Sequence, residues 1–245
     1  TSRPDDAVTR QLQIFNPQDI HSTDERNLAD LRKFAWQELL TLPVFSDWND
    51  QKKSHFLDQL IEKSGGMILY LRLLQESYRE NSQEPDDISN MPRGLEGFYQ
   101  QLFERLFPDR HQFEEVSKLL GLMVCALEPM TRDELEEALE IEEDVLDKFL
   151  QEISQILIKN PREGDPQRLC FTLCHKSLFD WLVSGGNPYL VSKKSAMKRM
   201  AAYCKDAIAH KTKGVSAYAR RHAVEHLVAI EDFQAIESVL CNLRF

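Results

Sequence analysis

The residues whose types and spacing are best suited to chemistry are His222, Glu225 and His226. They fit the pattern H-x-x-E-H, in which two histidines one helical turn apart bind zinc and the glutamate acts as the general base of a peptidase. Only the 19 residues from 227 to 245 follow to supply a third ligand, and the α/β pattern of that peptidase class is missing. We therefore favour helix packing over zinc binding for this pair of histidines.

A second cluster, Cys170, Cys174 and His175, lies where apolar and polar residues alternate as in a β-strand. Alternation places Cys170 and Cys174 on one face and His175 on the other, so the three cannot easily share a metal ion. We interpret the cysteines as small apolar residues of a strand. No phosphate-binding loop G-x-x-x-x-G-K-[ST] and no G-x-S-x-G motif occurs. We expect this chain alone to be no enzyme and to hydrolyse neither ATP nor GTP.

The composition limits the compartment and the partners. The chain has 245 residues and a net charge of −10, which disfavours nucleic-acid binding because phosphates repel an acidic surface. Its longest clean apolar run, residues 119–127, is about half of a membrane span. Five cysteines at irregular spacing indicate reduced thiols. The sequence thus predicts a cytoplasmic protein that binds neither nucleic acid nor membrane.

Helical periodicity dominates the elements that would hold these residues. Apolar residues recur at helical spacing in residues 28–42 and 56–61, and Ser64-Gly65-Gly66 interrupts the pattern. Residues 67–74 predict a buried helix, and residues 82–92 are polar and predict a linker. Further amphipathic helices are expected at 95–106 and 113–127.

The middle of the chain combines helices with a hairpin. Thr131 and Glu134 have the spacing of a capping box, which starts a short helix, and a longer helix is expected at 142–157. Residues 169–173 alternate as a strand, with a turn-rich loop at 160–166 and a partner strand at 157–159. Three helices followed by a hairpin is the order of a winged helix. The last helices are expected at 176–183, 191–210, 216–230 and 232–243. The predicted fold class is mainly α, a multi-domain helical array that contains a winged-helix domain with one short β-hairpin.

Winged helices often bind DNA, but the charge of this one disfavours that role. Residues 128–152 carry eleven acidic side chains, and Arg132 and Lys148 are their only basic ones. A recognition helix in this stretch would be repelled by phosphates. A solvated face or a protein-contact face is the better interpretation.

Several segments, taken together and in order, resemble the back half of NACHT proteins, a type of STAND-class nucleotide-operated switch. The segments that carry this resemblance are Thr1-Ser2-Arg3-Pro4, residues 27–42, residues 64–74, Met91-Pro92-Arg93-Gly94-Leu95-Glu96-Gly97-Phe98-Tyr99, Phe171 to Leu182 and Tyr218 to Leu243. The resemblance implies four parts. They are the end of a nucleotide-binding domain (1–22), a first helical domain (23–90), a winged helix (91–185) and the start of a second helical domain (186–245) that leads into repeats.

The resemblance also implies functional residues and a mechanism. Arg3 would act as sensor 1 at the terminal phosphate, and His175 would contact the β-phosphate of ADP and hold a closed state. The parent protein would bind ADP or ATP with Mg²⁺ in a domain that precedes Thr1. This chain would be its regulatory and oligomerisation part. Its partners would be that nucleotide-binding domain, C-terminal WD40, ankyrin or TPR repeats, other proteins, and further copies on activation.

One departure from the family keeps an alternative open. Related switches carry a proline shortly after the glycine of the first helical domain, where it packs on the adenine, and Gly65-Gly66-Met67-Ile68 has none. The alternative is a constitutive helical scaffold or adaptor with a degenerate nucleotide site. A zinc peptidase through His222, Glu225 and His226 is a distant third.

Overall fold

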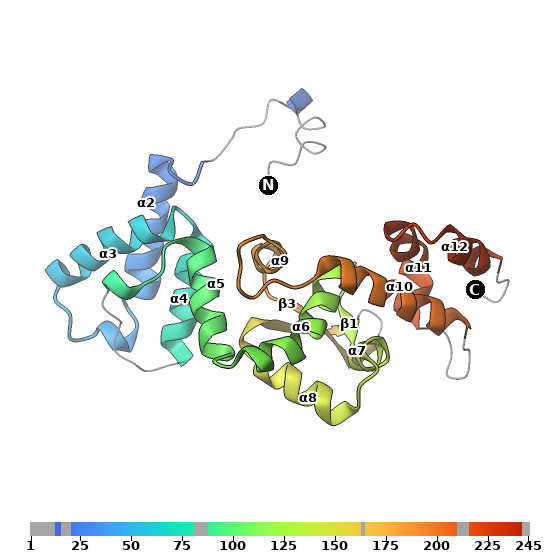
Figure 1. The fold of residues 1–245 in the computed structure, drawn as a ribbon. Helices are drawn as coiled ribbons and strands as arrows, with labels where there is room; N and C mark the ends of the chain where they lie inside the picture. The colour runs from blue at the N-terminus through green and yellow to red at the C-terminus, as the bar shows by residue number, and fades with distance from the viewer. Residues whose placement is uncertain (1–12, 16–20, 81–87, 163–164, 210–215, 242–245) are drawn as a thin grey trace. The chain divides into compact units, whose positions relative to one another are not determined.

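The computed structural model describes residues 13–15, 21–80, 88–162, 165–209 and 216–241. Arg3 therefore lies outside the described residues. The chain divides into two compact units, residues 1–98 (unit 1) and 99–245 (unit 2) (Figure 1). Helices dominate both units, and one small antiparallel sheet lies in unit 2. The predicted fold class, mainly α with a small hairpin region, is thus confirmed.

Unit 1 is helical throughout its described residues. Its elements are η1 (Gln13–Phe15), α2 (Glu25–Phe34), the π-helical turn η2 (Ala35–Leu39), η3 (Pro43–Phe45), α3 (Asp50–Ser64), α4 (Ile68–Glu80), η4 (Ile88–Asn90) and the start of α5 (Gly94–Leu106). Side-chain caps explain two of the starts, because Asp24 accepts from the Arg26 N–H and Asn49 from the Lys52 N–H. Gly65 ends α3 in the left-handed conformation (φ 59°), so the predicted break is confirmed.

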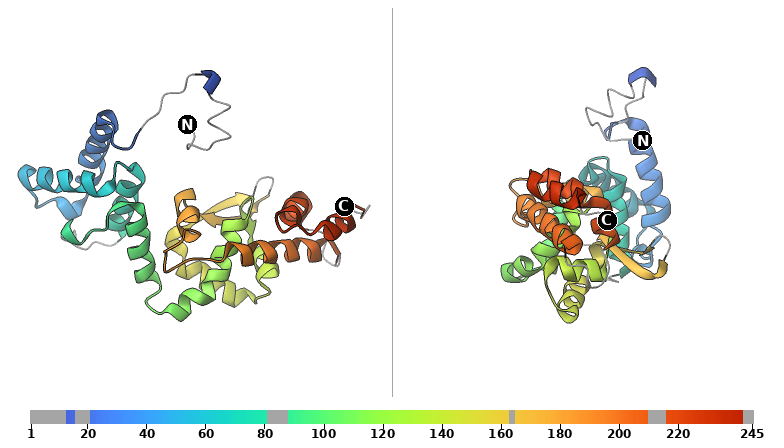
Figure 2. Two further views of the ribbon diagram at one scale, coloured as in Figure 1. Left: turned by 45° about the horizontal axis from the view of Figure 1, so that its top comes forward. Right: turned by 90° about the vertical axis from the view of Figure 1, so that its right-hand side faces the viewer.

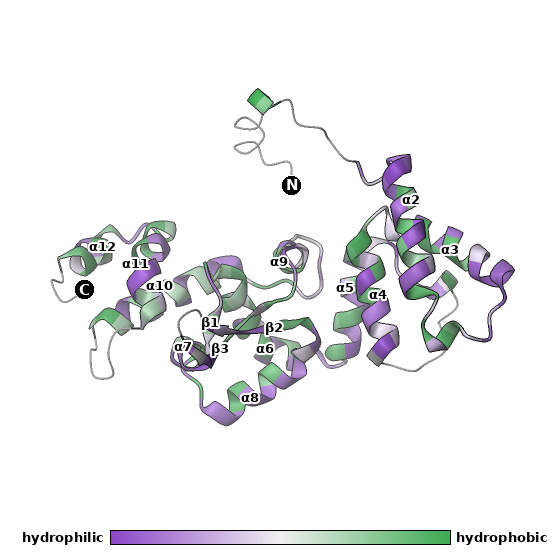
Figure 3. Ribbon diagram, turned by 180° about the vertical axis from the view of Figure 1, so that it is seen from behind, coloured by the Kyte–Doolittle hydropathy of each residue, from purple (hydrophilic) through white to green (hydrophobic). Residues whose placement is uncertain are grey.

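A single apolar cluster holds unit 1 together. Phe45 is fully buried and makes edge-on contacts with Trp48 and Tyr78, at centroid distances of 5.1 and 5.5 Å. The mixed colouring of the helices in Figure 3 reflects their amphipathic character, in which one side of each helix is buried. Gly66 fits where no side chain could, since a Cβ there would lie 2.0 Å from the Ser22 carbonyl oxygen.

The predicted linker at 82–92 is wrong for its last residues. Residues 81–87 lie outside the described part, but Met91 is only 6% exposed and belongs to the core of unit 1. The Tyr70 hydroxyl donates to the Pro92 carbonyl at 2.7 Å, and Lys63 Nζ donates to the Ser89 carbonyl at 3.1 Å. The polar composition of this segment gave no sign of one buried apolar residue and of three carbonyls, those of Ser89, Met91 and Pro92, that accept hydrogen bonds from side chains distant in sequence.

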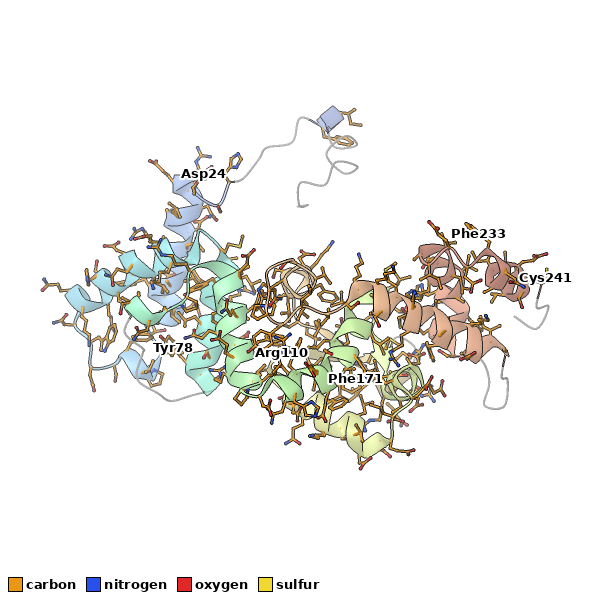
Figure 4. All side chains as sticks on the ribbon, in the orientation of Figure 1. Asp24, Tyr78, Arg110, Phe171, Phe233 and Cys241 are labelled. Carbon is orange, nitrogen blue, oxygen red and sulfur yellow. The ribbon has the colours of Figure 1, made fainter. Side chains whose placement is uncertain are left out.

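Unit 2 joins a small sheet to a helical array. Its elements after α5 are α6 (Arg110–Cys125), β1 (Met130–Thr131), α7 (Arg132–Leu139), α8 (Glu143–Glu152), η5 (Ser154–Ile156), β2 (Leu157–Arg162), β3 (Asp165–Leu173), α9 (Lys176–Leu182), α10 (Lys193–Ala209), α11 (Ala217–Ala229) and α12 (Phe233–Leu240). The strand order is β1-β3-β2, all antiparallel. Buried Phe171, labelled in Figure 4, lies on the middle strand opposite Met130 and Lys159. The order helix, strand, helix, helix, strand, strand is that of a winged helix.

Three expectations for this region need correction. β1 was not predicted, because two residues are too few to show an alternating pattern. The helix expected at 142–157 ends at Glu152, where Ile153 and Ile156 are buried through a 3₁₀ turn instead. Residues 160–162, expected in a loop, continue β2, and the register shifts between Pro161 and Arg162. Pro161 lies at this irregularity on an edge strand, where a proline is tolerated. The prediction of a loop from this proline is therefore wrong.

The core of unit 2 is aromatic at one end and crossed by α10. Phe103 contacts Phe113 and Trp181, at centroid distances of 6.3 and 4.9 Å, and Tyr189 packs on the same group. Helix α10 packs on α6, α7 and α11, and α11 in turn packs on α12 (Figure 2). Within the described ranges, every helix is too short or too polar to cross a membrane.

Candidate functional site

His175 lies between β3 and α9, at the N-cap position of the helix. Its backbone is extended (φ −145°, ψ 139°), and its imidazole makes no capping hydrogen bond to the helix. The side chain is half-buried, while the His175 carbonyl accepts from the Leu178 N–H at 3.0 Å. His175 thus directly precedes the helix that the sequence predicts from residue 176. The nucleotide contacts of Arg3 and His175 stay predictions, and Arg3 lies outside the described residues.

The neighbouring cysteines are part of the sheet and its exit. Cys170 is 6% exposed, and burial raises the pKa of its thiol. The Cys174 N–H donates to the Ile156 carbonyl at 2.8 Å, which joins the end of β3 to η5. These surroundings are those of small packing residues, as the sequence indicated.

The histidines of the H-x-x-E-H pattern lie on α11 in different surroundings. His222 Nδ1 lies 3.0 Å from Glu225 Oε2, and its Nε2 lies 3.6 Å from Glu128 Oε2, just beyond hydrogen-bond distance. His226 is 4% exposed, and its Nε2 lies 2.8 Å from the Tyr218 hydroxyl. Glu128, distant in sequence and N-terminal to the pattern, is thus brought beside the first histidine.

Tyr218 and burial together set the surroundings of His226. The Tyr218 oxygen accepts from the Leu127 N–H at 3.1 Å and lies 2.8 Å from His226 Nε2, to which it donates or from which it accepts according to the tautomer of the imidazole. Burial, and secondarily the neighbouring His222, lowers the pKa of His226 to about 4, which assigns a neutral imidazole at neutral pH.

The geometry does not assemble a zinc site. His226 Nε2 is already bound to a phenol, and in the described part of the chain no three His, Cys, Asp or Glu side chains are grouped to hold a metal ion. Tyr218, which is bound to His226, also accepts from the Leu127 N–H and so joins α11 to the segment that precedes β1. A buried neutral histidine in a hydrogen-bonded pair favours the packing interpretation.

Next to this pair lies the Glu134 junction, which we define as Glu134, Thr131, Arg162, Ser216 and Tyr218. Glu134 is 5% exposed and is the third residue of α7. The Thr131 N–H donates to its Oε2 at 2.9 Å, and the Glu134 N–H donates to the Thr131 hydroxyl at 3.3 Å. The predicted capping box is therefore confirmed.

The same carboxylate receives three more donors from elsewhere in the chain. Its Oε1 accepts from Arg162 Nη1 on β2 at 3.3 Å, from the Ser216 hydroxyl at 3.0 Å and from the Tyr218 N–H at 3.3 Å. Ser216 is also the N-cap of α11, where its oxygen accepts from the Ala219 N–H. One carboxylate thus ties α7, the hairpin and the N-terminus of α11 together, at the end of α11 where its dipole favours negative charge.

The charge of Glu134 is stabilised despite its burial. Burial raises the pKa, but the Thr131 N–H, the Arg162 guanidinium and the Ser216 and Thr131 hydroxyls outweigh it. The net pKa lies below the ordinary value for a glutamate. The junction is therefore anionic at neutral pH, and Arg162, whose side chain is 15% exposed, is its counter-charge.

A small hollow of about 210 Å³ lies beside the junction, lined in part by Glu128, Arg162, Cys170 and Arg221. Arg221 forms an ion pair with Glu128 across it. The hollow is smaller than ordinary ligand sites of about 300 to 1,000 Å³. Its contacts, like those of the Glu134 junction, hold the winged helix to α11.

The outer side of α8 is acidic, and its basic neighbours are occupied. Arg132 forms an ion pair with Asp147, and Lys148 Nζ lies 3.6 Å from Glu115 Oε2. Helix α8 itself carries Glu143, Asp144, Asp147 and Glu152 against Lys148, so this side keeps a net negative charge. This arrangement supports the interpretation from the sequence that the helix does not read DNA.

Sequence reasoning missed Arg162, Ser216 and Tyr218 as members of one site. The capping-box spacing singled out Glu134, but that rule concerns only residues within one turn. The available signal was an arginine in a strand and a serine at a helix start, which are too common to be joined without the fold. No protein-family description, curated protein or solved structure was found to match the chain.

Proposed function

We propose that this chain is a regulatory part of a nucleotide-dependent signalling switch and that it acts through protein contacts and not as an enzyme. The observation that carries the proposal is a winged helix joined to a helical array by the buried Glu134 junction, with His175 directly after the last strand. The winged helix and the array would move as one lever. The resemblance to NACHT proteins supports the same interpretation.

The nucleotide contact of the proposal depends on residues outside this chain. The chain has no phosphate-binding loop, and His175 can supply only one contact. ADP or ATP with Mg²⁺ would be held by the nucleotide-binding domain expected before Thr1. In the proposed closed state, the half-buried imidazole of His175 contributes a hydrogen bond to a phosphate of ADP, a contact made in that state only. A contact that differs between two states is what allows a ligand to select one of them.

The acidic side of α8 supports a protein-binding winged helix. Its paired cations, Arg132 and Lys148, leave a face of net negative charge that repels DNA and suits a basic protein surface. The acidic side of α8, which corresponds to the DNA-binding side of a winged-helix transcription factor, is therefore proposed to bind proteins. These include further copies of the parent protein on activation.

The constitutive scaffold remains the competing function, and the Glu134 junction also fits it. A fully satisfied buried polar network fixes one geometry, as a scaffold requires. The two functions differ in whether the state of His175 matters, because a scaffold has no closed state to release.

The test replaces His175 with Leu in the parent protein. The expected result is loss of retained ADP and a larger oligomeric fraction without stimulus, measured by nucleotide extraction and size-exclusion chromatography with light scattering. The matched control is His111→Leu, because His111 is an exposed histidine on α6. Unchanged ADP retention and unchanged oligomeric state would favour the scaffold, provided that thermal unfolding shows both variants to be folded.

A further inference from the structure

Unit 1 contains a groove that plays no part in the proposed function. Its volume is about 640 Å³, within the range of ligand-binding sites. All of its lining residues belong to α3, to η4 or to the segments next to them. They are Trp48, Lys52, His55, Phe56, Gln59, Glu62, Lys63, Ile88, Ser89 and Arg93. We call it the basic groove.

The apolar floor of the basic groove is held in place by ring contacts. Trp48 meets Phe45 and Phe56 edge-on, at centroid distances of 5.1 and 5.2 Å and interplanar angles near 85°. Phe45 is fully buried and Phe56 is 5% exposed, so both rings are fixed by the core of unit 1. The Trp48 side chain is therefore pre-positioned, which lowers the entropy cost of binding an apolar side chain against it.

The rim of the groove carries positive charge. Lys52 Nζ lies 3.9 Å from the Trp48 ring centroid, and Lys63 Nζ donates to the carbonyls of Ser89 and Met91. An ammonium has three N–H donors, so two carbonyls leave one donor for a ligand. Neither lysine forms an ion pair with a described carboxylate.

Arg93 and Glu62 complete the rim. Their ion pair has a separation of 3.2 Å, with side chains 79% and 71% exposed, so it is weak and easily exchanged for another carboxylate. Three permanent cations thus face one carboxylate in this groove, in a chain whose net charge is −10. The groove is thus locally positive in a negatively charged chain, and this positive charge favours an anionic ligand.

We infer that the basic groove binds an acidic peptide segment of a partner protein, with carboxylates at Lys52, Lys63 and Arg93 and an apolar side chain against the floor. Charge complementarity selects carboxylates, and the apolar floor that Trp48 and Phe56 line selects an apolar neighbour in the same ligand. A nucleic acid is disfavoured because the field of the whole chain repels a long polyanion, whereas a short peptide meets only the groove. The inference does not rest on the proposed function.

The test uses the chain as it is and a capped peptide, Asp-Glu-Phe-Asp-Glu. Isothermal titration at low ionic strength is expected to detect binding that weakens as salt is added. The amide counterpart, Asn-Gln-Phe-Asn-Gln, is expected to bind at least about tenfold more weakly, since it keeps the ring and loses the charges. Equal binding of the two peptides would overturn the inference.

Charge reversal then locates the site. Lys52→Glu combined with Arg93→Glu is expected to lower the affinity by about tenfold or more, because two attractive contacts become repulsive. The matched control is Lys33→Glu combined with Arg72→Glu, which changes the net charge equally at two exposed positions outside the groove. An equal loss of affinity in both variants would reduce the effect to net charge and overturn the inference.

A third variant distinguishes a partner peptide from the chain's own acids. Glu84, Asp86 and Asp87 precede Ile88 in the sequence, and Glu84→Gln, Asp86→Asn and Asp87→Asn together remove their charge. Binding to the unaltered chain supports a partner peptide. Binding to this triple variant only would assign the groove to the chain's own segment and overturn the inference.

Discussion

The two units bury polar side chains in different ways. The buried polar side chains in the described part of unit 1 are Ser64 and Gln75, both neutral. Ser64 donates to the Ile61 carbonyl at 2.7 Å and accepts from the Gly66 N–H at 3.2 Å, and Gln75 donates to the Glu38 carbonyl at 2.9 Å. Unit 2 instead buries the carboxylate of Glu134 and the imidazole of His226. Both groups are ionisable, and the Glu134 carboxylate connects elements that are far apart in the sequence.

The two units are thus stabilised differently, unit 1 mainly by apolar packing and unit 2 also by a buried, paired charge. Apolar packing, as in unit 1, is non-directional and tolerates exchange of one side chain for another of similar volume. A buried charge demands every one of its partners, because an unpaired charge in the interior is costly. Unit 2 is therefore the unit in which single polar substitutions and changes of pH have large effects, and the following experiments test that contrast.

The largest effect is expected for Glu134→Ala. The substitution leaves Arg162 buried without its counter-charge, which we expect to lower the free energy of unfolding of unit 2 by about 3 to 5 kcal/mol. Hydrogen exchange read on peptides of each unit measures the loss and should show it in unit 2. The control Glu137→Ala, at an exposed position of the same helix, should cost about 0.5 kcal/mol or less. A loss in the free energy of unfolding below about 1 kcal/mol for Glu134→Ala would contradict the proposed difference between the two units.

The next effect concerns pH and His226. Its pKa is lowered to about 4 in the folded chain, from 6.5, so the unfolded chain takes up this proton more readily. The contribution of His226 to stability is full above pH 6.5 and is lost as the pH falls toward 4, by about 3 kcal/mol in all. Denaturant unfolding across this range measures it. His226→Gln should flatten the profile and exposed His111→Gln should not; an unchanged slope in His226→Gln would refute the assignment.

A smaller effect compares one tyrosine in each unit. Tyr218→Phe leaves the Leu127 N–H and His226 Nε2 without their partner, which we expect to cost about 2 kcal/mol. Tyr70→Phe removes one hydrogen bond to the Pro92 carbonyl and should cost about 1 kcal/mol. Chemical denaturation of both variants measures the two losses in the free energy of unfolding. Equal losses would mean that the polar contacts of unit 2 contribute no more than those of unit 1.

The smallest effect is expected on the surface of unit 1. Arg32 and Asp58 form an ion pair whose side chains are 46% and 59% exposed. Arg32→Ala should lower the free energy of unfolding by about 0.5 kcal/mol or less, because solvent screens such pairs. A loss above about 1 kcal/mol in a denaturant melt would show that unit 1 also depends on charge.

Local rules predicted the elements of this chain well. Helical spacing placed most of the helices, and the Thr131–Glu134 capping box and the break at Gly65 are both present as predicted. The errors occur where a non-local contact outweighs local composition. Met91 is drawn into a core that its polar neighbours do not reveal, and β1 forms only because Met130 and Thr131 find partners on β3.

The candidate site was less predictable, for the same reason. The spacing of the sequence singled out His222, Glu225 and His226, and the resemblance to NACHT proteins singled out His175. The sequence could not show that the Tyr218 hydroxyl is bound to His226, nor that Ser216 meets Glu134, because each pairing depends on how α11 packs. The predictions that Arg3 reaches the terminal phosphate and that His175 contacts the β-phosphate of ADP stay predictions.

The Glu134 junction has a practical consequence for dissecting this protein. A fragment of residues 91–185 would retain Thr131 and Arg162 but lack Ser216 and Tyr218, two of the donors to the Glu134 carboxylate. Water would replace them, and the surface normally covered by α11 would be left open. A fragment that extends through Leu240 keeps every donor, so it is the better choice for expressing the winged helix in isolation.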